Sequence, residues 1–446
     1  MTPPRPIGTT GRSTLRGLIA GFRNDLLSAL PERLYRGWMA EFRAPFVHSF
    51  FCNDPELVRR ILNDPDQFPK SMLMREGLAP LLGNGVFISN GADWAQQRRI
   101  IDPAFQGGRI RDTLPAIWAA ADATVARLSD GETDIEPVAA HAAADVIFRA
   151  LFSIPISDDI AGQVFAAFQA HQRAQPLVNI AALVPWPRWL PRPHSRRTRD
   201  TAARIRALID RLVTDRQAAI DAGDAPDDLA TRIMTTSDSE TGRCFTRAEM
   251  VDQVAVMFLA GHETSASVLA WALWLLAAHP DWQAKIAAEA ATLTPDMAAL
   301  SRMPATRAVF RETLRLYPGV AMFTRAAGRR QTFRDRRVPR GAQLTISPWH
   351  LHRHQRLWDR PDDFDPARWD NPAGQDSARH AFIPFSAGPR ACPGAGLAMA
   401  EGVIMLARIV GAFHLSPGSR APMPVLRLTL RSRDGILITL RKRATE

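Results

Sequence analysis

The segment from about Arg247 to Ala278 constrains the fold of this 446-residue chain more than any other. Its apolar residues lie almost all round a helix, which is the pattern of a helix buried through a protein. At its midpoint, Ala260 to Ser265 combine small residues with polar ones, where burying a polar group is costly. We therefore expect a long central helix whose middle turn has a special role.

Thr264 gives this middle turn a possible geometry. Its hydroxyl can bond back to the carbonyl of Ala260, four residues earlier, which opens or bends a helix. Gly261 leaves room beside it, and Glu263 adds an acid. Together they predict a small groove for a diatomic ligand and ordered water. For an isolated Ala-Gly pair, a structural helix kink would be the better interpretation.

A second feature is a loop centred on one cysteine. Cys392 is framed by Gly388 and Gly394, with Arg390 two positions before it and Phe385 seven before it. Glycines let a backbone pass close to a large planar group. An arginine can pair with an anionic edge of that group, and a phenylalanine can shield the sulfur. The pattern fits a thiolate that binds a metal cofactor.

The position of Cys392 supports the thiolate form. The apolar run Ala395 to Ala412 predicts a helix just after it, and a helix N-terminus favours a thiolate over a thiol. The alternative for a lone cysteine is an ordinary buried thiol. The other cysteines, Cys52 and Cys244, are far away, so neither a disulfide framework nor a cysteine-bound zinc or iron–sulfur site is indicated.

Two further pairs stand at helical spacing. Trp94 and Arg98 are four residues apart, so an indole N–H and a guanidinium could clamp a carboxylate; plain cation–π packing is the alternative. Glu312 and Arg315 are three apart and can form an ion pair on one helix face.

The net charge of +11 comes almost entirely from arginine. The arginines are scattered and interleaved with acids, and no nucleic-acid-binding motif accompanies them. The charge alone therefore does not indicate a nucleic-acid interface. The simpler interpretation is that most of these arginines lie on solvent-exposed helix faces. The functional alternative is a basic surface that docks an acidic electron-transfer protein.

The loop around Cys392 resembles the haem-binding loop of cytochrome P450 enzymes. Five separated motifs between residues 94 and 396 are similar to soluble bacterial members of that family. The resemblance implies haem b (iron protoporphyrin IX), with Cys392 as the iron ligand and Phe385, Gly388 and Gly394 in the cofactor loop. Ala260 and Gly261 would also contact the haem.

The same resemblance assigns the remaining polar residues. Thr264 would act beside the O2 position, and Glu263 would belong to the proton-delivery route. Trp94, Arg98 and Arg390 would bind the haem propionates, as would Arg325. Arg368 would join Glu312 and Arg315 in a structural triad that braces the cysteine loop.

The implied function is a cytochrome P450 monooxygenase that inserts one atom of O2 into a hydrophobic small molecule. Its electrons would come from NAD(P)H through a separate ferredoxin-type donor and reductase. Apolar residues at 70–90, Val320 to Phe323 and Phe258 would face the substrate. A peroxide-driven hydroxylase and a non-enzymatic haem gas sensor or carrier are the alternatives. Glu263 and Thr264 favour O2 chemistry over both.

The expected organisation is a single domain, 1–446, mainly α with a minor β lobe. The β lobe would take about 40–65 and 318–350, and the helical lobe about 94–317 and 392–412. Residues 70–90 read as a long functional loop, and 426–440 as a hairpin around Asp434-Gly435.

The N-terminal apolar patch, Leu15 to Phe22, is much shorter than the ~20 apolar residues that cross a bilayer. We expect no transmembrane anchor, a cytoplasmic location, a monomer, and no nucleic-acid partner.

Overall fold

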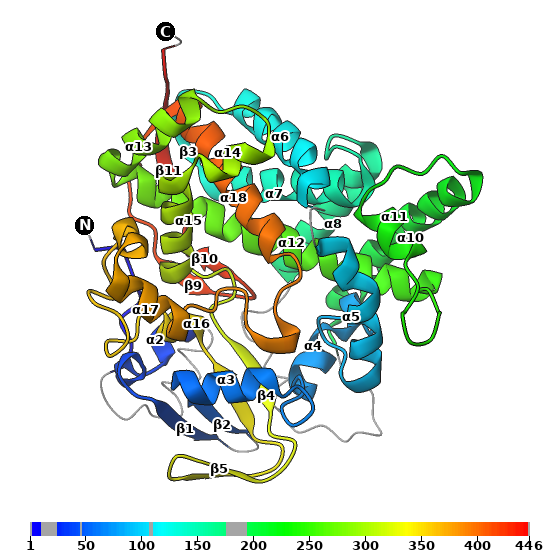
Figure 1. Ribbon diagram of the computed structural model, residues 1–446, viewed down its shortest axis with the longest axis vertical. Helices are drawn as coiled ribbons and strands as arrows, with labels where there is room; N and C mark the ends of the chain where they lie inside the picture. The colour runs from blue at the N-terminus through cyan, green and yellow to red at the C-terminus, as the bar shows by residue number, and fades with distance from the viewer. Residues whose placement is uncertain (1, 10–24, 45–46, 107–109, 175–193, 445–446) are drawn as a thin grey trace.

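Figure 1 shows the computed structural model of the chain, coloured from the N-terminus to the C-terminus. The structure describes residues 2–9, 25–44, 47–106, 110–174 and 194–444. The N-terminal patch at 15–22 and the proline-rich stretch at 185–193 lie outside these residues.

Helices make up most of the described chain, which confirms the mainly α prediction. The α-helices are α2 (Leu26–Ala29), α3 (Pro55–Asn63), α4 (Met72–Leu82), α5 (Gly91–Phe105), α6 (Ile110–Arg127), α7 (Ile135–Phe152), α8 (Asp159–Ala174), α10 (Arg196–Ala222), α11 (Leu229–Thr235), α12 (Arg247–Ala277), α13 (Pro280–Ala291), α14 (Met297–Ser301), α15 (Pro304–Leu316), α16 (Pro348–Leu351), α17 (Pro372–Ala381) and α18 (Ala395–Ala412). Short 3-10 helices are η1 (Glu32–Tyr35), η3 (Pro366–Asp370) and η4 (Gly388–Arg390).

Helix α12 is the central helix that the sequence predicts, and it crosses the middle of the molecule (Figure 1). A capping box begins it: Thr246 accepts a hydrogen bond from the Glu249 N–H, and the Glu249 carboxylate accepts one from the Thr246 N–H. Its apolar residues are buried against α7, α10 and α18. Burial on nearly every side explains the absence of an amphipathic pattern.

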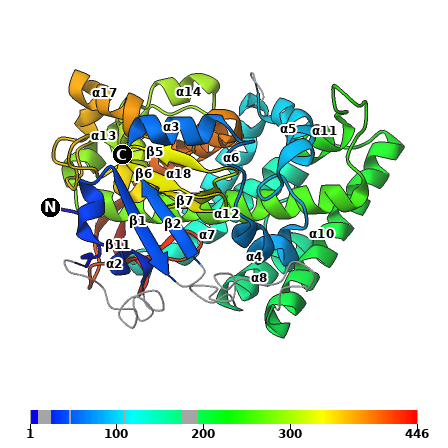
Figure 2. The same cartoon turned by 90° about the horizontal axis from the view of Figure 1, so that it is seen from below.

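A four-stranded sheet forms the core of the minor β region. The strands are β1 (Met39–Ala44), β2 (Val47–Cys52), β3 (Gly131–Asp134), β4 (Phe323–Ala326), β5 (Gln331–Phe333), β6 (Arg336–Val338), β7 (Gln343–Ile346), β8 (Phe413–Pro417), β9 (Pro424–Leu426), β10 (Leu430–Ser432) and β11 (Leu437–Lys442). The sheet has the order β1-β2-β7-β4, with β2 parallel to β7. Seen from below, it lies at the opposite side of the molecule from α10 and α11 (Figure 2).

The predicted hairpin at 426–440 is wrong. Strand β10 pairs with β9, whereas β11 lies between β3 and β8. Gly435 does turn the chain, with a φ of 82°, but Asp134 accepts a hydrogen bond from the Ile436 N–H and directs the following residues to β3. Both edges of β11 therefore pair with strands that are distant in sequence. The alternation of apolar and polar residues within one segment does not reveal which strands those are.

The predicted loop at 70–90 is also wrong in its first half, because Met72–Leu82 forms helix α4. Gly77 and Pro80 weaken the helical pattern, since both are unfavourable in a helix interior. Packing against α10 and α12 nevertheless holds the segment helical. Here tertiary contacts outweigh local propensity.

Two helices, α12 and α18, are long and apolar enough to span a membrane, but 72% and 61% of their apolar windows are buried inside the protein. Burial of that extent is what core helices show.

Candidate haem site

The cysteine loop joins η4 to the start of α18. The backbone N–H of Cys392 donates to the Phe385 carbonyl, 2.9 Å away, which closes the loop. Burial raises the pKa of the Cys392 thiol, while the Gly394 backbone and the Arg98 cation act against that rise. Cys392 as a whole residue is nevertheless exposed. The side chain therefore lies among protein groups and still has accessible surface.

The two glycines of the loop differ in what they allow. Gly388 has a φ of 70°, and a Cβ there would lie 2.4 Å from the Leu62 carbonyl oxygen in α3. Gly394 is open, with the Cys392 sulfur and a Phe105 ring carbon both 4.0 Å from such a Cβ. Gly388 therefore lets the loop pack against α3, and only Gly394 leaves space near the sulfur.

The middle turn of α12 has the predicted back-bond, since the Thr264 hydroxyl donates to the Ala260 carbonyl at 2.6 Å. Ala260 is exposed although most of the helix is buried. On another side of Thr264 lies Gly319, where a Cβ would come within 3.1 Å of both the Cβ and the carbonyl oxygen of Thr264. In the middle of this mostly buried helix, the exposed residue thus lies on the turn that carries the hydroxyl.

Glu263 is buried and points to the C-terminal strands, where Oε1 accepts a hydrogen bond from the Thr429 hydroxyl at 3.0 Å. Burial raises its pKa, and the Arg431 charge and the Thr429 hydrogen bond oppose that. His262 is also buried, bonds to the Phe258 carbonyl at 2.6 Å, and has a pKa lowered to about 4, mainly by burial. Both polar residues therefore have partners away from Thr264.

Two of the predicted residues of α12, Phe258 and Gly261, lie against α7. Phe258 is 2% exposed and packs against Phe148, Phe152 and Phe168, so its assignment to the substrate face is wrong. A Cβ on Gly261 would lie 2.4 Å from Ile147, so this glycine makes room for α7. A one-residue shift on a helix turns a side chain by about 100°, and an all-round apolar pattern does not show which face a residue takes.

Trp94 and Arg98 both contact the cysteine loop from α5. The Arg390 guanidinium lies 4.1 Å from the centre of the Trp94 ring. Arg98 donates to the Ala391 carbonyl at 2.8 Å and forms an ion pair with Asp102 at 2.7 Å. The structure therefore brings α5 and the loop together, as the family resemblance implies.

Two more cations lie nearby. Arg325 on β4 is 2% exposed, and burial lowers its pKa to about 10. The pKa of Arg390 is also lowered to about 10, by burial and by the charges of Arg325 and Arg98. Lys70, which the sequence analysis missed, faces Arg325 and Arg390, and burial together with these charges lowers its pKa well below the usual value. We call Lys70, Arg98, Arg325 and Arg390 the cation cluster.

The cation cluster lacks the carboxylates that would neutralise it. Within the described parts of the chain, only Arg98 of the four has an ion pair, the one with Asp102. The Nε of Arg390 is buried with no hydrogen-bond partner. Buried cations are unfavourable unless an anion accompanies them. These residues therefore fit a cofactor that carries carboxylates, as haem does, with the Cys392 sulfur as its thiolate ligand.

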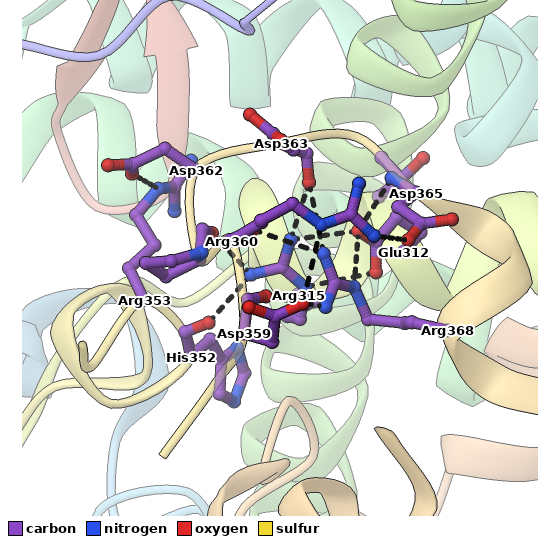
Figure 3. A network of polar contacts seen from close by, with 12 residues as sticks. Glu312, Arg315, His352, Arg353, Asp359, Arg360, Asp362, Asp363, Asp365 and Arg368 are labelled. Atoms are coloured by element: carbon purple, nitrogen blue, oxygen red, sulfur yellow. Dashed lines mark hydrogen bonds and ion pairs between the residues drawn. The ribbon is translucent and has the colours of Figure 1, made fainter. Parts of the chain in front are cut away.

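A second charged network lies at the end of α15 and is shown in Figure 3. Glu312 accepts hydrogen bonds from Arg315, at 2.8 and 2.9 Å, and from Arg368, at 3.0 Å. All three side chains are at most 4% exposed. The predicted triad is therefore present. The Glu312 carboxylate also accepts a hydrogen bond from the Asp365 N–H, so both of its oxygens have partners. We call Glu312, Arg315 and Arg368 the brace.

The brace reaches the cysteine loop through one histidine. Arg315 donates to the His352 carbonyl at 2.8 Å, and the His352 Nε2 accepts from the Ile383 N–H at 2.9 Å. Ile383 lies two residues before Phe385, where the cysteine loop begins. The contact supports a structural role for the brace.

Residues 34–438 match the family model "Cytochrome P450". A mainly helical fold in which a cysteine loop leads into a helix, α18, that packs against the central helix α12 is characteristic of haem-thiolate proteins. The chain belongs to the cytochrome P450 family, and it is a monooxygenase of that family.

Similar proteins come from bacteria and from plants. Cyclooctatin synthase of Streptomyces melanosporofaciens is 33% identical, over 91% of this chain and 89% of that protein. Cyclooctat-9-en-7-ol 5-monooxygenase of the same organism is 30% identical, over 93% and 91%. Cytochrome P450 714C3 of Oryza sativa subsp. japonica is 31% identical, over 95% and 86%.

Proposed function

We propose that this enzyme is a haem b monooxygenase in which Cys392 is the thiolate ligand of the iron. The observation that carries the proposal is an exposed Cys392 beside a cluster of four cations, three of which have no ion pair within the described residues. When bound, a thiolate-ligated haem supplies reductive activation of O2 and favours O–O cleavage. The chain's own residues orient the cofactor, hold protons and exclude water.

The two propionates would be bound by Trp94, Arg98, Arg325 and Arg390. These side chains lie together in a region where cations outnumber carboxylates. Phe385 and Gly394 would lie against the cofactor on the sulfur side. Ala260 would also lie against the cofactor. Gly261 and Gly388 would contribute backbone contacts only, because Ile147 and Leu62 fill the space where a Cβ of each glycine would lie.

Thr264 and Glu263 would serve proton delivery. The Thr264 hydroxyl is fixed by the Ala260 carbonyl on the exposed turn of α12, so its lone pairs can hold a water beside the O2 position. Burial raises the pKa of Glu263, which lets it hold a proton nearer to neutral pH than an ordinary carboxyl does. Thr429 connects it to the C-terminal strands.

The substrate would be a hydrophobic small molecule. Met74, Leu78, Val86 and Phe87 are partly buried apolar residues between α3 and α5, and they support such a site. Electrons would come from NAD(P)H through a separate ferredoxin-type protein and its reductase. Free cysteines such as Cys52 and Cys244 are compatible with a cytoplasmic location. The proposed enzyme is a single-domain monomer.

Replacing the sulfur tests the ligand assignment. We expect reduced wild-type protein with carbon monoxide to show the red-shifted Soret band of thiolate-ligated haem, and Cys392→Ser to lose it. The matched control is Cys244→Ser, because Cys244 is a free, exposed cysteine far along the chain, and it should keep the band. A Cys392→Ser protein that retains the band contradicts the assignment.

Removing the Thr264 hydroxyl tests proton delivery. In Thr264→Ala we expect less product and more hydrogen peroxide per NAD(P)H consumed, by about tenfold or more, which is the scale of lost proton-transfer catalysis. Thr264→Ser should stay close to wild type. Thr124→Ala controls for the helix, since Thr124 makes the same back-bond to Ala120 on α6. Unchanged coupling in Thr264→Ala would remove this residue from the mechanism.

A further inference from the structure

The turn at 83–86, which follows α4, packs very closely against the first half of α12. Gly83 has a φ of 55°, and a Cβ there would overlap the carboxylate of Asp252. A Cβ on Gly85 would lie 2.6 Å from the Val256 side chain. The two glycines therefore let the backbone of the turn lie directly on α12, where a larger residue would push the turn away.

The carboxylate of Asp252 joins this turn to two helices. Its Oδ2 accepts a hydrogen bond from the Asn84 N–H at 2.8 Å, and its Oδ1 forms an ion pair with Arg206 Nη2, on α10, at 2.7 Å. Arg206 also donates from Nη1 to the Leu81 carbonyl, in the last turn of α4, at 3.1 Å. One carboxylate of α12 is thus connected with α10 and with both the end of α4 and the turn after it.

Two glutamines hold the rest of the turn. Gln253 is fully buried, and its Oε1 accepts a hydrogen bond from the Val86 N–H at 3.0 Å. Gln97 of α5 donates from Nε2 to the Asn84 carbonyl at 2.7 Å. The backbone at 84–86 is therefore bound from α12 and from α5, which leaves Val86 and the following Phe87 little freedom to move.

Val86 and Phe87 lie along the face of α12 that bears the proposed substrate site. Ala260, the exposed residue of the middle turn, is seven residues after Gln253. That spacing is about two helical turns, so the two residues share one face of α12 and are roughly 10 Å apart. Val86, which binds Gln253, and Phe87 are apolar and only partly buried, as the wall of an apolar pocket requires.

We propose that Asp252 is a positioning residue for substrate recognition. Its carboxylate fixes Val86 and Phe87 beside the substrate, and the ion pair with Arg206 makes their position depend on α10. The inference rests on the proposed function and deepens it, because Asp252 would determine which apolar molecules fit above the iron without touching them. An amide at this position has a single oxygen, so it could replace the carboxylate toward Asn84 or toward Arg206 but not toward both.

Two iron-binding probes of different size test the proposal. Imidazole and 4-phenylimidazole both bind ferric haem iron through nitrogen and shift its Soret band, but only the second carries a phenyl ring that needs the apolar wall. In Asp252→Asn we expect 4-phenylimidazole to bind about five- to tenfold more weakly and imidazole to bind as in the wild type. The ratio of the two dissociation constants is the measurement, because general damage to the haem site would change both constants alike.

Variants of the partner show whether the ion pair acts through the same carboxylate. Arg206→Met should change the ratio in the same direction by a smaller factor, and Arg206→Lys, which keeps the charge, should stay close to the wild type. The double variant Asp252→Asn/Arg206→Met should equal Asp252→Asn alone, since one carboxylate serves both effects. The matched control is Asp210→Asn, because Asp210 and Arg247 form another ion pair between α10 and α12, at the first residue of α12. It should keep the wild-type ratio.

The outcomes separate this inference from the proposed function. A wild-type ratio in Asp252→Asn, or an equal change in Asp210→Asn, overturns the role of Asp252. If Asp252→Asn yields no haem protein, Arg206→Met decides, since Arg206 is the more exposed member of the pair, and an unchanged ratio there overturns the inference. If the wild-type protein shows no thiolate carbon monoxide band, the proposed function itself fails.

Discussion

The brace and the cation cluster are both built from buried arginines, but they differ in what accompanies the charge. In the brace, one carboxylate accepts from both arginines, and the remaining guanidinium donors bind backbone carbonyls such as those of His352 and Pro361. In the cation cluster, Lys70, Arg325 and Arg390 have no ion pair within the described residues. The first region is complete as the chain folds, and the second is complete only with an added anion.

The comparison separates residues that support the fold from residues that bind. A buried charge whose partners are all in the chain contributes to structure, whereas a buried charge without them indicates a missing ligand. Exposure alone would not separate the two, since Arg325 is as deeply buried as Arg368, at 2% and 3%.

Removing the carboxylate of the brace should have the largest effect on stability. Glu312→Gln leaves Arg315 and Arg368 buried without a counter-charge, and the expected loss of unfolding free energy is about 3–5 kcal/mol, measured by chemical denaturation. Asp376→Asn is the control, because Asp376 and Arg379 form an ion pair of the same i, i+3 spacing that is at least 60% exposed.

That exposed pair should contribute less than about 1 kcal/mol. Equal losses in the two variants would show that the brace does not differ from a surface ion pair. In the cation cluster, by contrast, Arg325→Met should weaken haem retention and leave the free energy of unfolding of the protein nearly unaltered.

Glu401 is the opposite case, a buried carboxylate that has no ion pair within the described residues. It lies on α18, 3% exposed, and its Oε2 accepts from the Ser265 hydroxyl at 2.8 Å. Among the residues that the structure describes, none is a hydrogen-bond partner of its Oε1. Burial raises the pKa of this carboxyl to about 8, with Ser265 acting against it.

A raised pKa makes the stability depend on pH. The folded protein keeps the Glu401 proton that the unfolded chain releases above its ordinary pKa, so the contribution to stability is present at low pH and is lost as pH rises toward 8. The slope is up to about 1.4 kcal/mol per pH unit between roughly pH 4.3 and 8. Glu401→Gln should flatten unfolding curves measured across this range, and Glu240→Gln, an exposed control, should not. An unchanged slope in Glu401→Gln would show that the carboxyl titrates normally.

Local patterns predict the elements whose partners are close in sequence or whose chemistry is rare. The cysteine loop, α12, α18 and the Thr264 back-bond all follow from their own residues. The pairing of Glu312 with Arg368 needed the family resemblance, because no spacing rule connects residues 56 positions apart.

Other features depend on contacts that no single segment contains. Lys70 reads as an ordinary surface lysine, and only the fold brings Arg325 of β4 and Arg390 of the cysteine loop next to it. Strand β11 acquires both neighbours from distant parts of the chain, and α4 is helical because α10 and α12 cover it. The side of α12 that Phe258 takes could not be predicted, because a helix buried all round gives no periodicity to orient it.

The parallel pairing of β2 with β7 has a consequence for synthesis in the cell. Ser49 on β2 and Thr345 on β7, whose hydroxyls are 3.2 Å apart, are separated by 296 positions. At about 5–20 residues per second, a ribosome needs roughly 15–60 s to make the second strand after the first. During that time the inner edge of β2 has unpaired backbone groups, which are a template for aggregation. The nascent chain therefore has a vulnerable period that the finished fold conceals.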